Sequence, residues 1–223
     1  MYTLTAADFA DTGQWQLIIK MSPEGLEADL RNTLHPEIPL QNLCSLRWNT
    51  KDSSVKDNIE SAVYENPRLL DDFATKIVMY DPMTLFIPSD VLESHGAEAE
   101  IYGKVYPSES EDVMYDRFGD MTAAWKLAPG VRNFLLRTFP GARLANNLME
   151  KVKTLSTRKE GVLLHISTRV DSSDFILTDD GKLIAACTKP IFLKEDIDAT
   201  VRMMTEAYGY RPEDIRIETE RDS

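Results

Sequence analysis

The sequence predicts an α/β protein in which a β-β-β-α-β unit occurs twice, each copy forming a mixed sheet flanked by helices. Short runs rich in β-branched and aromatic residues are separated by turn residues and amphipathic segments, which is typical of alternating strands and helices. The same order of elements is found near both ends of the chain. The 223 residues, 43% of them hydrophobic, are enough to bury a sizeable core and lie between the lengths of one domain and two.

The first copy begins with an apolar run and a turn at Ser22–Gly25, in which proline and glycine favour a tight hairpin. The next run alternates apolar and polar residues, as expected of a half-buried return strand. Asp52 and Ser53 are expected to cap a helix with one apolar face. The predicted strands are 15–21, 26–30, 43–48, 76–80 and 84–87, and the helix carries Val55, Ile59, Ala62 and Val63 on its apolar face.

The second copy repeats this order near the end of the chain. Asp179–Gly181 has the residues of a tight turn between its second and third strands. Asp196 is expected to cap a helix that ends at Gly209, because glycine is favoured just after a helix. The predicted strands are 161–166, 174–178, 182–188 and 214–218, and the apolar stripe of the helix is Ile197, Val201, Met204 and Tyr208.

The segment between the copies is less regular. The polar stretch Ser156–Glu160 is the predicted boundary between the two halves. We therefore expect one domain at 1–157, a first half with an inserted hairpin and helices, and a second, shorter half at 158–223. The elements expected in the intervening segment are strands at 113–117 and 122–127 and helices at 129–138 and 148–155.

The charge balance excludes several classes of protein. The chain has 25 Lys and Arg against 37 Asp and Glu, a formal charge of −12. Nucleic acid is not expected as a partner, because binding it requires a concentrated basic patch. No apolar run approaches the ~18 residues of a membrane span, and the first ten residues lack the features of a secretory signal, so we expect an acidic cytoplasmic protein. The cations of the longest basic stretch are assigned to the solvated face and end of a helix: Lys151, Lys153, Arg158 and Lys159.

The cysteines and histidines form no recognisable site. Cys44 and Cys187 lie in the third strand of each copy, with no neighbouring histidine or cation that would lower the thiol pKa. Both are expected to be small buried residues in a reducing compartment. His35, His95 and His165 are far apart and lack metal-ligand spacing, so no metal site is expected.

Five short runs scattered over most of the chain resemble one family. They are Leu17–Gly25, Ile59–Pro67, Leu85–Pro88, Phe139–Ala142 and Asp180–Leu183. Through them the chain resembles domain-of-unknown-function family 3822, and its two β-β-β-α-β units resemble the actin and RNase H-like group. The resemblance implies an actin-like ATPase fold in a cytoplasmic bacterial protein of unestablished function. None of the runs is a catalytic signature, and a fold alone does not establish an activity.

The resemblance also implies where nucleotide would bind. In the actin-like group an acid-x-glycine turn between the first two strands of each half reaches the phosphates, because glycine lets backbone N–H groups approach them. Here the turn at Met21–Gly25 lacks that spacing, and the turn at Ser167–Ser173 has no glycine. We therefore expect no catalytic residue and no cofactor, with ATP and Mg²⁺ as the alternative.

If nucleotide binds, the candidate residues are on the turn of the second half. They are Ser167, Thr168, Arg169 and Asp171, with Asp171 directed toward a metal ion. The competing interpretation is a polar, solvent-exposed hairpin without a ligand.

Two hypotheses for function follow. The preferred one is a non-catalytic actin-like scaffold that acts through protein–protein contacts, with an unknown protein or by self-association. The alternative is a divergent ATP-binding protein or ATPase that uses non-standard loops at 22–25 and 167–173.

Overall fold

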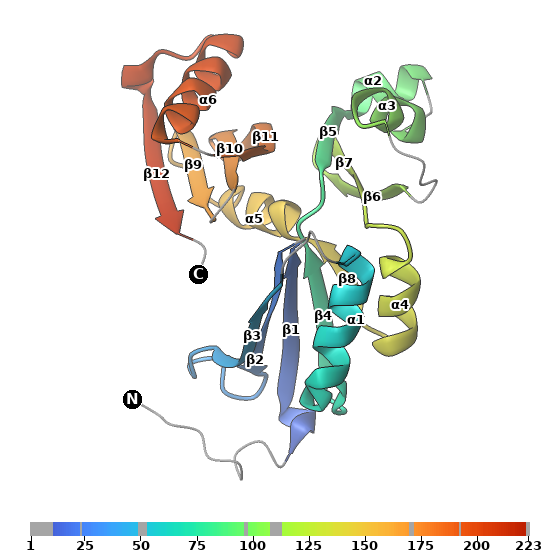
Figure 1. Cartoon of the computed structure of the whole chain (residues 1–223). Coiled ribbons are helices and arrows are strands. Elements are labelled where there is room, and N and C mark those ends of the chain that lie inside the picture. The colour runs from blue at the N-terminus through green and yellow to red at the C-terminus, as the bar shows by residue number, and fades with distance from the viewer. Residues whose placement is uncertain are drawn as a thin grey trace. The chain divides into compact units, whose positions relative to one another are not determined.

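A computed structural model describes residues 11–22, 24–48, 53–95, 98–107, 113–169, 172–191 and 193–221. The contacts between residues divide the chain into two compact units (Figure 1). The first comprises Met1–Pro82 and Leu127–Asn147, and the second comprises Met83–Lys126 and Leu148–Ser223. This grouping differs from the predicted ranges 1–157 and 158–223. Residues 83–126 and the predicted helix at 148–155, which were assigned to the first half, group with the C-terminal strands.

The first unit is a five-stranded mixed sheet with the order β3-β2-β1-β4-β8. Its first three strands form an antiparallel meander, and β4 and β8 are parallel to β1. The elements are η1 (Thr12–Gln14), β1 (Trp15–Ser22), β2 (Gly25–Asn32), β3 (Gln41–Arg47), α1 (Val55–Glu65), η2 (Pro67–Leu70), β4 (Thr75–Tyr80), α4 (Val131–Thr138) and β8 (Arg143–Asn146).

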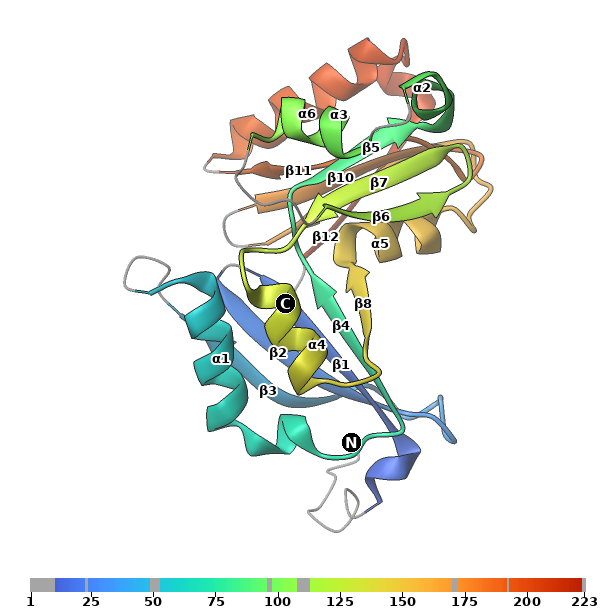
Figure 2. The same ribbon diagram turned by 90° about the vertical axis from the view of Figure 1, so that its right-hand side faces the viewer.

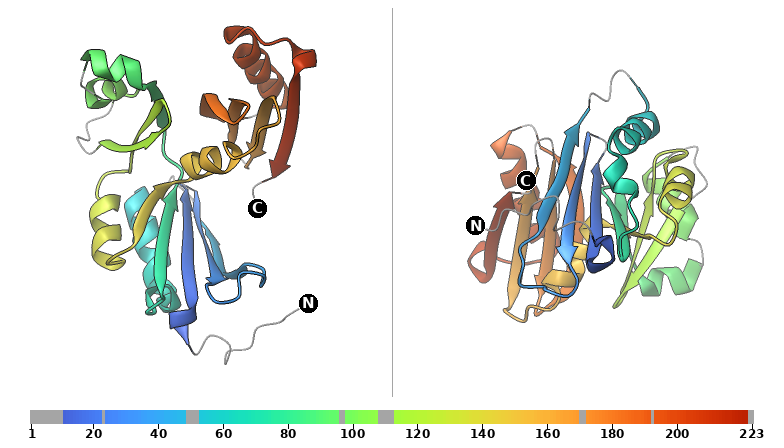
Figure 3. Two further views of the ribbon diagram at one scale, coloured as in Figure 1. Left: turned by 180° about the vertical axis from the view of Figure 1, so that it is seen from behind. Right: turned by 90° about the horizontal axis from the view of Figure 1, so that it is seen from below.

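One face of this sheet forms the core of the first unit. Leu17 and Ile19 of β1 pair with Leu30 and Ala28 of β2, and all four are fully buried. Helices α1 and α4 lie on one side of the sheet, as Figure 3 shows from behind. The helices therefore cover the apolar face, as the alternation of the strands predicts.

The second unit contains a four-stranded sheet, β11-β10-β9-β12, and a three-stranded sheet, β5-β7-β6. Strand β5 lies against β11 (Figure 2). The elements are β5 (Thr84–Pro88), α2 (Ser89–His95), α3 (Glu98–Val105), β6 (Val113–Phe118), β7 (Met121–Lys126), α5 (Asn147–Leu155), β9 (Val162–Thr168), β10 (Ser172–Asp179), β11 (Lys182–Pro190), α6 (Lys194–Ala207), η3 (Pro212–Asp214) and β12 (Ile215–Arg221).

Alternating residues of β9 and β10 face two different helices. Leu163 and Ile176 pack with residues of α5, including Met149. Leu164 and Phe175 pack with Met204 of α6. The sheet is therefore buried between α5 on one face and α6 on the other, which explains its long apolar runs.

The predicted fold class, a mixed α/β protein, is confirmed. Every predicted strand is present, with ends displaced by up to three residues, and the third strand of each copy contains its cysteine. Strand β8 and helices α2 and α3 were not predicted. The turn at Asp180 and Gly181 has positive φ at both residues, as expected of a tight hairpin.

Two predicted helix caps were wrong. Ser54, one residue after Ser53, caps α1 by accepting a hydrogen bond from the Asp57 amide at 3.1 Å; Asp52 is outside the described residues. Helix α6 starts after Leu193, and Asp196 is its third residue. The carboxylate of Asp196 instead accepts a hydrogen bond from the Leu193 amide at 2.8 Å, which still satisfies a free donor at the helix start.

Among the helices in the described part of the chain, none combines the length and the apolar character needed to cross a bilayer.

Candidate functional site

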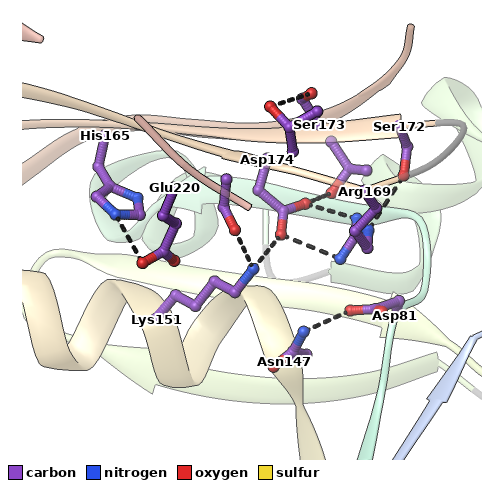
Figure 4. Close-up of polar contacts among 12 residues, drawn as sticks. Asp81, Asn147, Lys151, His165, Arg169, Ser172, Ser173, Asp174 and Glu220 are labelled. Carbon is purple, nitrogen blue, oxygen red and sulfur yellow. Dashed lines mark hydrogen bonds and ion pairs between the residues drawn. The ribbon is translucent and has the colours of Figure 1, made fainter. Parts of the chain in front are cut away.

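A row of polar side chains crosses the sheet of the second unit beneath α5. The strand register places Asp174 of β10 opposite Ser167 of β9 and opposite Thr188 of β11. On its own strand, each of the three is an even number of residues from a residue that packs on α5, and residues at even spacing share a face of the sheet. The reference residues are Leu163 for Ser167, Ile176 for Asp174 and Ala186 for Thr188, so the polar side chains also face α5. Figure 4 shows these contacts around Asp174.

The Asp174 carboxylate is the centre of the row. Its side chain is 1% exposed. Lys151 of α5 donates to Asp174 Oδ2 at 2.9 Å and to Ser167 Oγ at 2.8 Å. The Thr188 hydroxyl donates to Asp174 Oδ1 at 2.7 Å. A buried carboxylate needs such partners, because an unpaired one loses its hydration without compensation.

Arg169, directly after β9, completes the cluster. Its Nη2 and Nη1 donate to the two carboxylate oxygens of Asp174 at 2.8 and 3.2 Å, which is a bidentate pair. Its Nε donates to Ser172 Oγ at 3.1 Å, and its backbone amide donates to the Ser172 carbonyl at 2.8 Å. Arg169 therefore connects the two ends of the β9–β10 turn through both its side chain and its backbone. We call Lys151, Ser167, Arg169, Asp174 and Thr188 the Asp174 cluster.

Three of the four predicted site residues are within or beside this cluster. Ser167 and Arg169 bind its charges, and the Thr168 hydroxyl accepts a hydrogen bond from Ser173 Oγ at 3.3 Å. Asp171 lies outside the described residues. The interpretation of a solvent-exposed hairpin is wrong for the described residues, since Ser167 and Ser173 are fully buried.

Sequence reasoning missed Asp174, Lys151 and Thr188. Lys151 was assigned to a solvated helix face, but its side chain is only 16% exposed. A usable signal was present: Lys151 follows Leu148 by three residues and precedes Leu155 by four, so it shares the apolar face of its helix. Asp174 likewise alternates with Ile176 on the buried face of β10.

The row continues toward the edge strand β12. Its register places Glu220 opposite Ser167. Glu220 Oε2 lies 3.6 Å from Nε2 of His165, a buried residue two positions before Ser167 on β9.

The corresponding hairpin of the first unit is built differently. Ser22 Oγ accepts a hydrogen bond from the Glu24 amide at 3.2 Å. A Cβ atom on Gly25 would lie 2.6 Å from the Leu46 carbonyl oxygen of β3. The glycine is therefore required by the close approach of a neighbouring strand, which is a structural reason independent of any phosphate.

Neither cysteine is activated. Burial raises the pKa of the Cys44 thiol, and the charge of Asp29 acts in the same direction. Burial also raises the pKa of Cys187, which the charge of Lys189 only partly offsets. Both thiols are therefore protonated at neutral pH and poor nucleophiles.

Among the residues that the structure describes, no three His, Cys, Asp or Glu side chains are grouped so that they could hold a metal ion. Asp81, directly after β4, accepts a hydrogen bond from Asn147 Nδ2 at 2.9 Å within the first unit.

Comparison with known proteins identifies the fold. No family model and no curated protein matches the chain. A crystal structure from Bacteroides thetaiotaomicron VPI-5482, described as a protein with actin-like ATPase fold and unknown function, is similar with a TM-score of 0.81 at 20% identity. The match covers 97% of this chain and 84% of that one. The chain therefore has the predicted actin-like ATPase fold, whereas membership of family 3822 stays a prediction.

More distant structures are similar at a level that carries no argument about function. The type II variant of the Aquifex aeolicus Ppx/GppA phosphatase has a TM-score of 0.45 at 9% identity, over 92% of this chain and 67% of that one. A PilM–PilN type IV pilus biogenesis complex has a TM-score of 0.48 at 13% identity, over 85% and 66%.

Proposed function

We propose that this chain is an actin-like scaffold that does not hydrolyse nucleotide and acts through contacts with other proteins. The observation that carries the proposal is the position of the Asp174 carboxylate. It accepts hydrogen bonds from Lys151 and Arg169 at the turn where the actin-like resemblance would place phosphates. A fold of this kind supports many activities, so the proposed function rests on the residues of this turn and not on the architecture.

The cations at the turn already have an anionic partner. Lys151 and Arg169 contact Asp174 at 2.8–2.9 Å, the distances that they would have to a phosphate oxygen. A phosphate that took these contacts would leave the Asp174 carboxylate buried without its two cationic partners, with only the Thr188 hydroxyl still bonded to it. Breaking a buried pair in this way costs about 3–5 kcal/mol, which opposes nucleotide binding.

The backbone at the turn also offers little to a phosphate. The Arg169 amide is already bonded to the Ser172 carbonyl. Ser167 has a fully buried side chain, and the turn contains no glycine. Phosphate-binding loops depend on free backbone N–H groups that the ligand can approach closely.

The alternative of a divergent nucleotide-binding protein has one supporting observation. Two cations and three hydroxyl groups, those of Ser167, Ser172 and Thr188, gather at one turn. These are groups that bind phosphate elsewhere. Under this alternative Asp171 would orient a magnesium ion, as the sequence suggested.

Thermal unfolding with and without millimolar Mg-ATP separates the two. A ligand at 100 times its dissociation constant stabilises by about 2.7 kcal/mol, or roughly 5–10 °C for a chain of this length. We expect no shift and no release of phosphate. A shift of that size that is lost in Asp171→Ala, but kept in the control Asp198→Ala on the exposed side of α6, would replace the scaffold proposal by the nucleotide-binding one.

A further inference from the structure

The outer edge of β12 has no partner strand in the described part of the chain. Strand β12 is the last in the order β11-β10-β9-β12 and pairs only with β9, in parallel. Its counterpart β4 in the first unit lies between β1 and β8. An open edge of seven residues presents a row of backbone donors and acceptors that can pair with another chain.

The side chains on this edge differ between the two faces of the sheet. Ile217 pairs with Leu164, so it lies on the α6 face, and it is 50% exposed. Arg216 and Glu218 flank it and lie on the α5 face. The edge therefore presents an exposed apolar residue on one face and two opposite charges on the other.

We propose that β12 pairs with β12 of a second copy of this chain, antiparallel and around a two-fold axis at Ile217. This inference deepens the proposed function, since it names one protein contact of the scaffold. It would join two four-stranded sheets into one continuous sheet, through an interface that uses the same residues on both copies.

The backbone limits where such an axis can lie. In an antiparallel pair, opposite residues either both direct their backbone groups to each other or both direct them away. Along one strand this direction alternates from each residue to the next. If the axis lay between two residues, each residue would lie opposite its neighbour, and their backbone groups would point in different directions. A symmetric pair must therefore place one residue opposite its own copy. The candidates at the centre of the strand are Ile217, Glu218 and Thr219.

Charge selects among these three positions. An axis at Glu218 would place Glu218 opposite its own copy, and an axis at Thr219 would place Glu218 opposite Glu220. Both arrangements bring like charges together, which is destabilising. An axis at Ile217 places Ile217 opposite Ile217 and Arg216 opposite Glu218, twice by symmetry. The strand is therefore complementary to itself in one register only among the three.

The charges concerned are held at the edge by neighbouring side chains. Arg158 Nη1 donates to Glu218 Oε2 at 2.6 Å, and Arg216 pairs with Glu160 and Glu218. Although partial desolvation raises it, the hydrogen bonds and charges of Arg158 and Arg216 together lower the pKa of Glu218. Glu218 is thus ionised at neutral pH. Each of its oxygens already accepts one hydrogen bond and can accept another from a second arginine.

The mass of the full chain in solution, measured by light scattering after size exclusion at several concentrations, tests this contact. We expect twice the chain mass of 25.3 kDa. Arg216→Glu alone and Glu218→Arg alone should each weaken the dimer by about tenfold or more, since like charges then face each other. The control Arg202→Glu reverses an exposed charge on α6 and should leave the dimer intact.

Mixing the two single variants gives the sharpest result. One copy then carries Glu at positions 216 and 218 and the other carries Arg at both, so each of the two 216–218 pairs across the axis is of opposite charge. We expect the mixture to regain the dimer mass that each variant lacks alone. Ile217→Lys places two cations opposite each other at the axis and should give a monomer. Adding Ile217→Lys to both charge variants should also keep their mixture monomeric.

Three outcomes would overturn the proposal. A wild-type chain that stays monomeric at all concentrations excludes the dimer. A dimer that is insensitive to Arg216→Glu and Ile217→Lys is formed by another surface, and a mixture that stays monomeric excludes the register. None of these outcomes changes the response to Mg-ATP, so failure here is distinguishable from failure of the proposed function.

Discussion

Each unit has a charged group on its central strands, and the two groups differ in burial. In the first unit Lys20 Nζ lies 3.4 Å from Asp29 Oδ2 and 3.6 Å from Glu27 Oε2, and the Lys20 side chain is 39% exposed. In the second unit Asp174 is 1% exposed and its cations lie at 2.8–2.9 Å. The Asp29 side chain is itself only 9% exposed, but Lys20 and Glu27, the latter 25% exposed, reach water, so the first group is more accessible than the second.

The difference follows from which helix covers which face. Lys20 alternates with Ile19 on β1, and Glu27 and Asp29 alternate with Ala28 and Leu30 on β2. Since Ile19, Ala28 and Leu30 are fully buried, the charged residues lie on the other face of the sheet, opposite α1 and α4. In the second unit α5 covers the face that carries Asp174 and supplies Lys151 to it. Exposed ion pairs contribute about 0–1 kcal/mol, whereas loss of one partner of a buried pair is far more costly. Burial, more than the number of charges, decides what each group contributes.

Asp174→Asn should have the largest effect. The amide removes the negative charge from between Lys151 and Arg169 and leaves both cations without their shared partner. We expect a loss of about 3–5 kcal/mol in the free energy of unfolding, measured by urea titration. The matched change Glu27→Gln in the first unit should cost less than about 1 kcal/mol. Equal effects of the two variants would contradict the comparison.

Gly181→Ala should have the next largest effect. Gly181 has φ +79°, and its Cβ would lie 2.5 Å from the Ser156 carbonyl oxygen and 2.9 Å from that of Arg158. We expect a loss of about 2–4 kcal/mol from the left-handed backbone and the overlap together.

The control for this change is Gly141→Ala in the first unit. Gly141 has φ +76°, but nothing lies within 4 Å of its Cβ position. This variant should lose only about 1–2 kcal/mol of the free energy of unfolding, the cost of the backbone conformation alone. A melting temperature that falls equally in both variants would show that the overlap at Gly181 is relieved by a small shift.

The smallest effect concerns one buried tyrosine in each unit and is expressed only at high pH. Burial raises the pKa of Tyr80 to about 12, and the charges of Asp81 and Glu24 act in the same direction. Burial, followed by the influence of Tyr106, raises the pKa of Tyr102 to about 12. In the unfolded chain both would ionise near 10.

The sign of the pH dependence follows from these values. Because the folded pKa is higher, the unfolded state loses its phenolic protons first, so this stability is complete below about pH 10 and is lost as the pH rises to about 12. Absorbance at high pH should show tyrosines that ionise late in the folded chain and near pH 10 in urea. Tyr80→Phe should remove one of the late groups, and an unchanged titration would contradict the assignment.

Local patterns predicted the strands well because each strand of the meanders is five residues or longer and shows either an apolar alternation or a continuous apolar run. Strand β8 was missed because four residues, Arg143–Asn146, are too few to show a period. Helices α2 and α3 were missed because each has only seven or eight residues, about two turns, which is too short for a helical period to stand out. The cap positions were displaced by one to three residues, as is usual for helix ends.

The site was predicted only where its residues are adjacent in sequence. Ser167, Thr168 and Arg169 were identified together because they follow one strand. Lys151 and Asp174 are 23 residues apart and meet only because α5 packs on β9 and β10. That contact depends on tertiary packing, so the composition of the turn alone suggested a solvated hairpin where the structure has a buried ion cluster.

The first unit is interrupted by 44 residues of the second, Met83–Lys126, before its last strand β8 appears. During synthesis, β4 therefore leaves the ribosome long before the strand that pairs with its outer side. Since chains emerge at about 5–20 residues per second, that side of β4 stays open for seconds in every nascent molecule. The interval closes only when Arg143–Asn146 has left the ribosome and paired with Ile77–Tyr80.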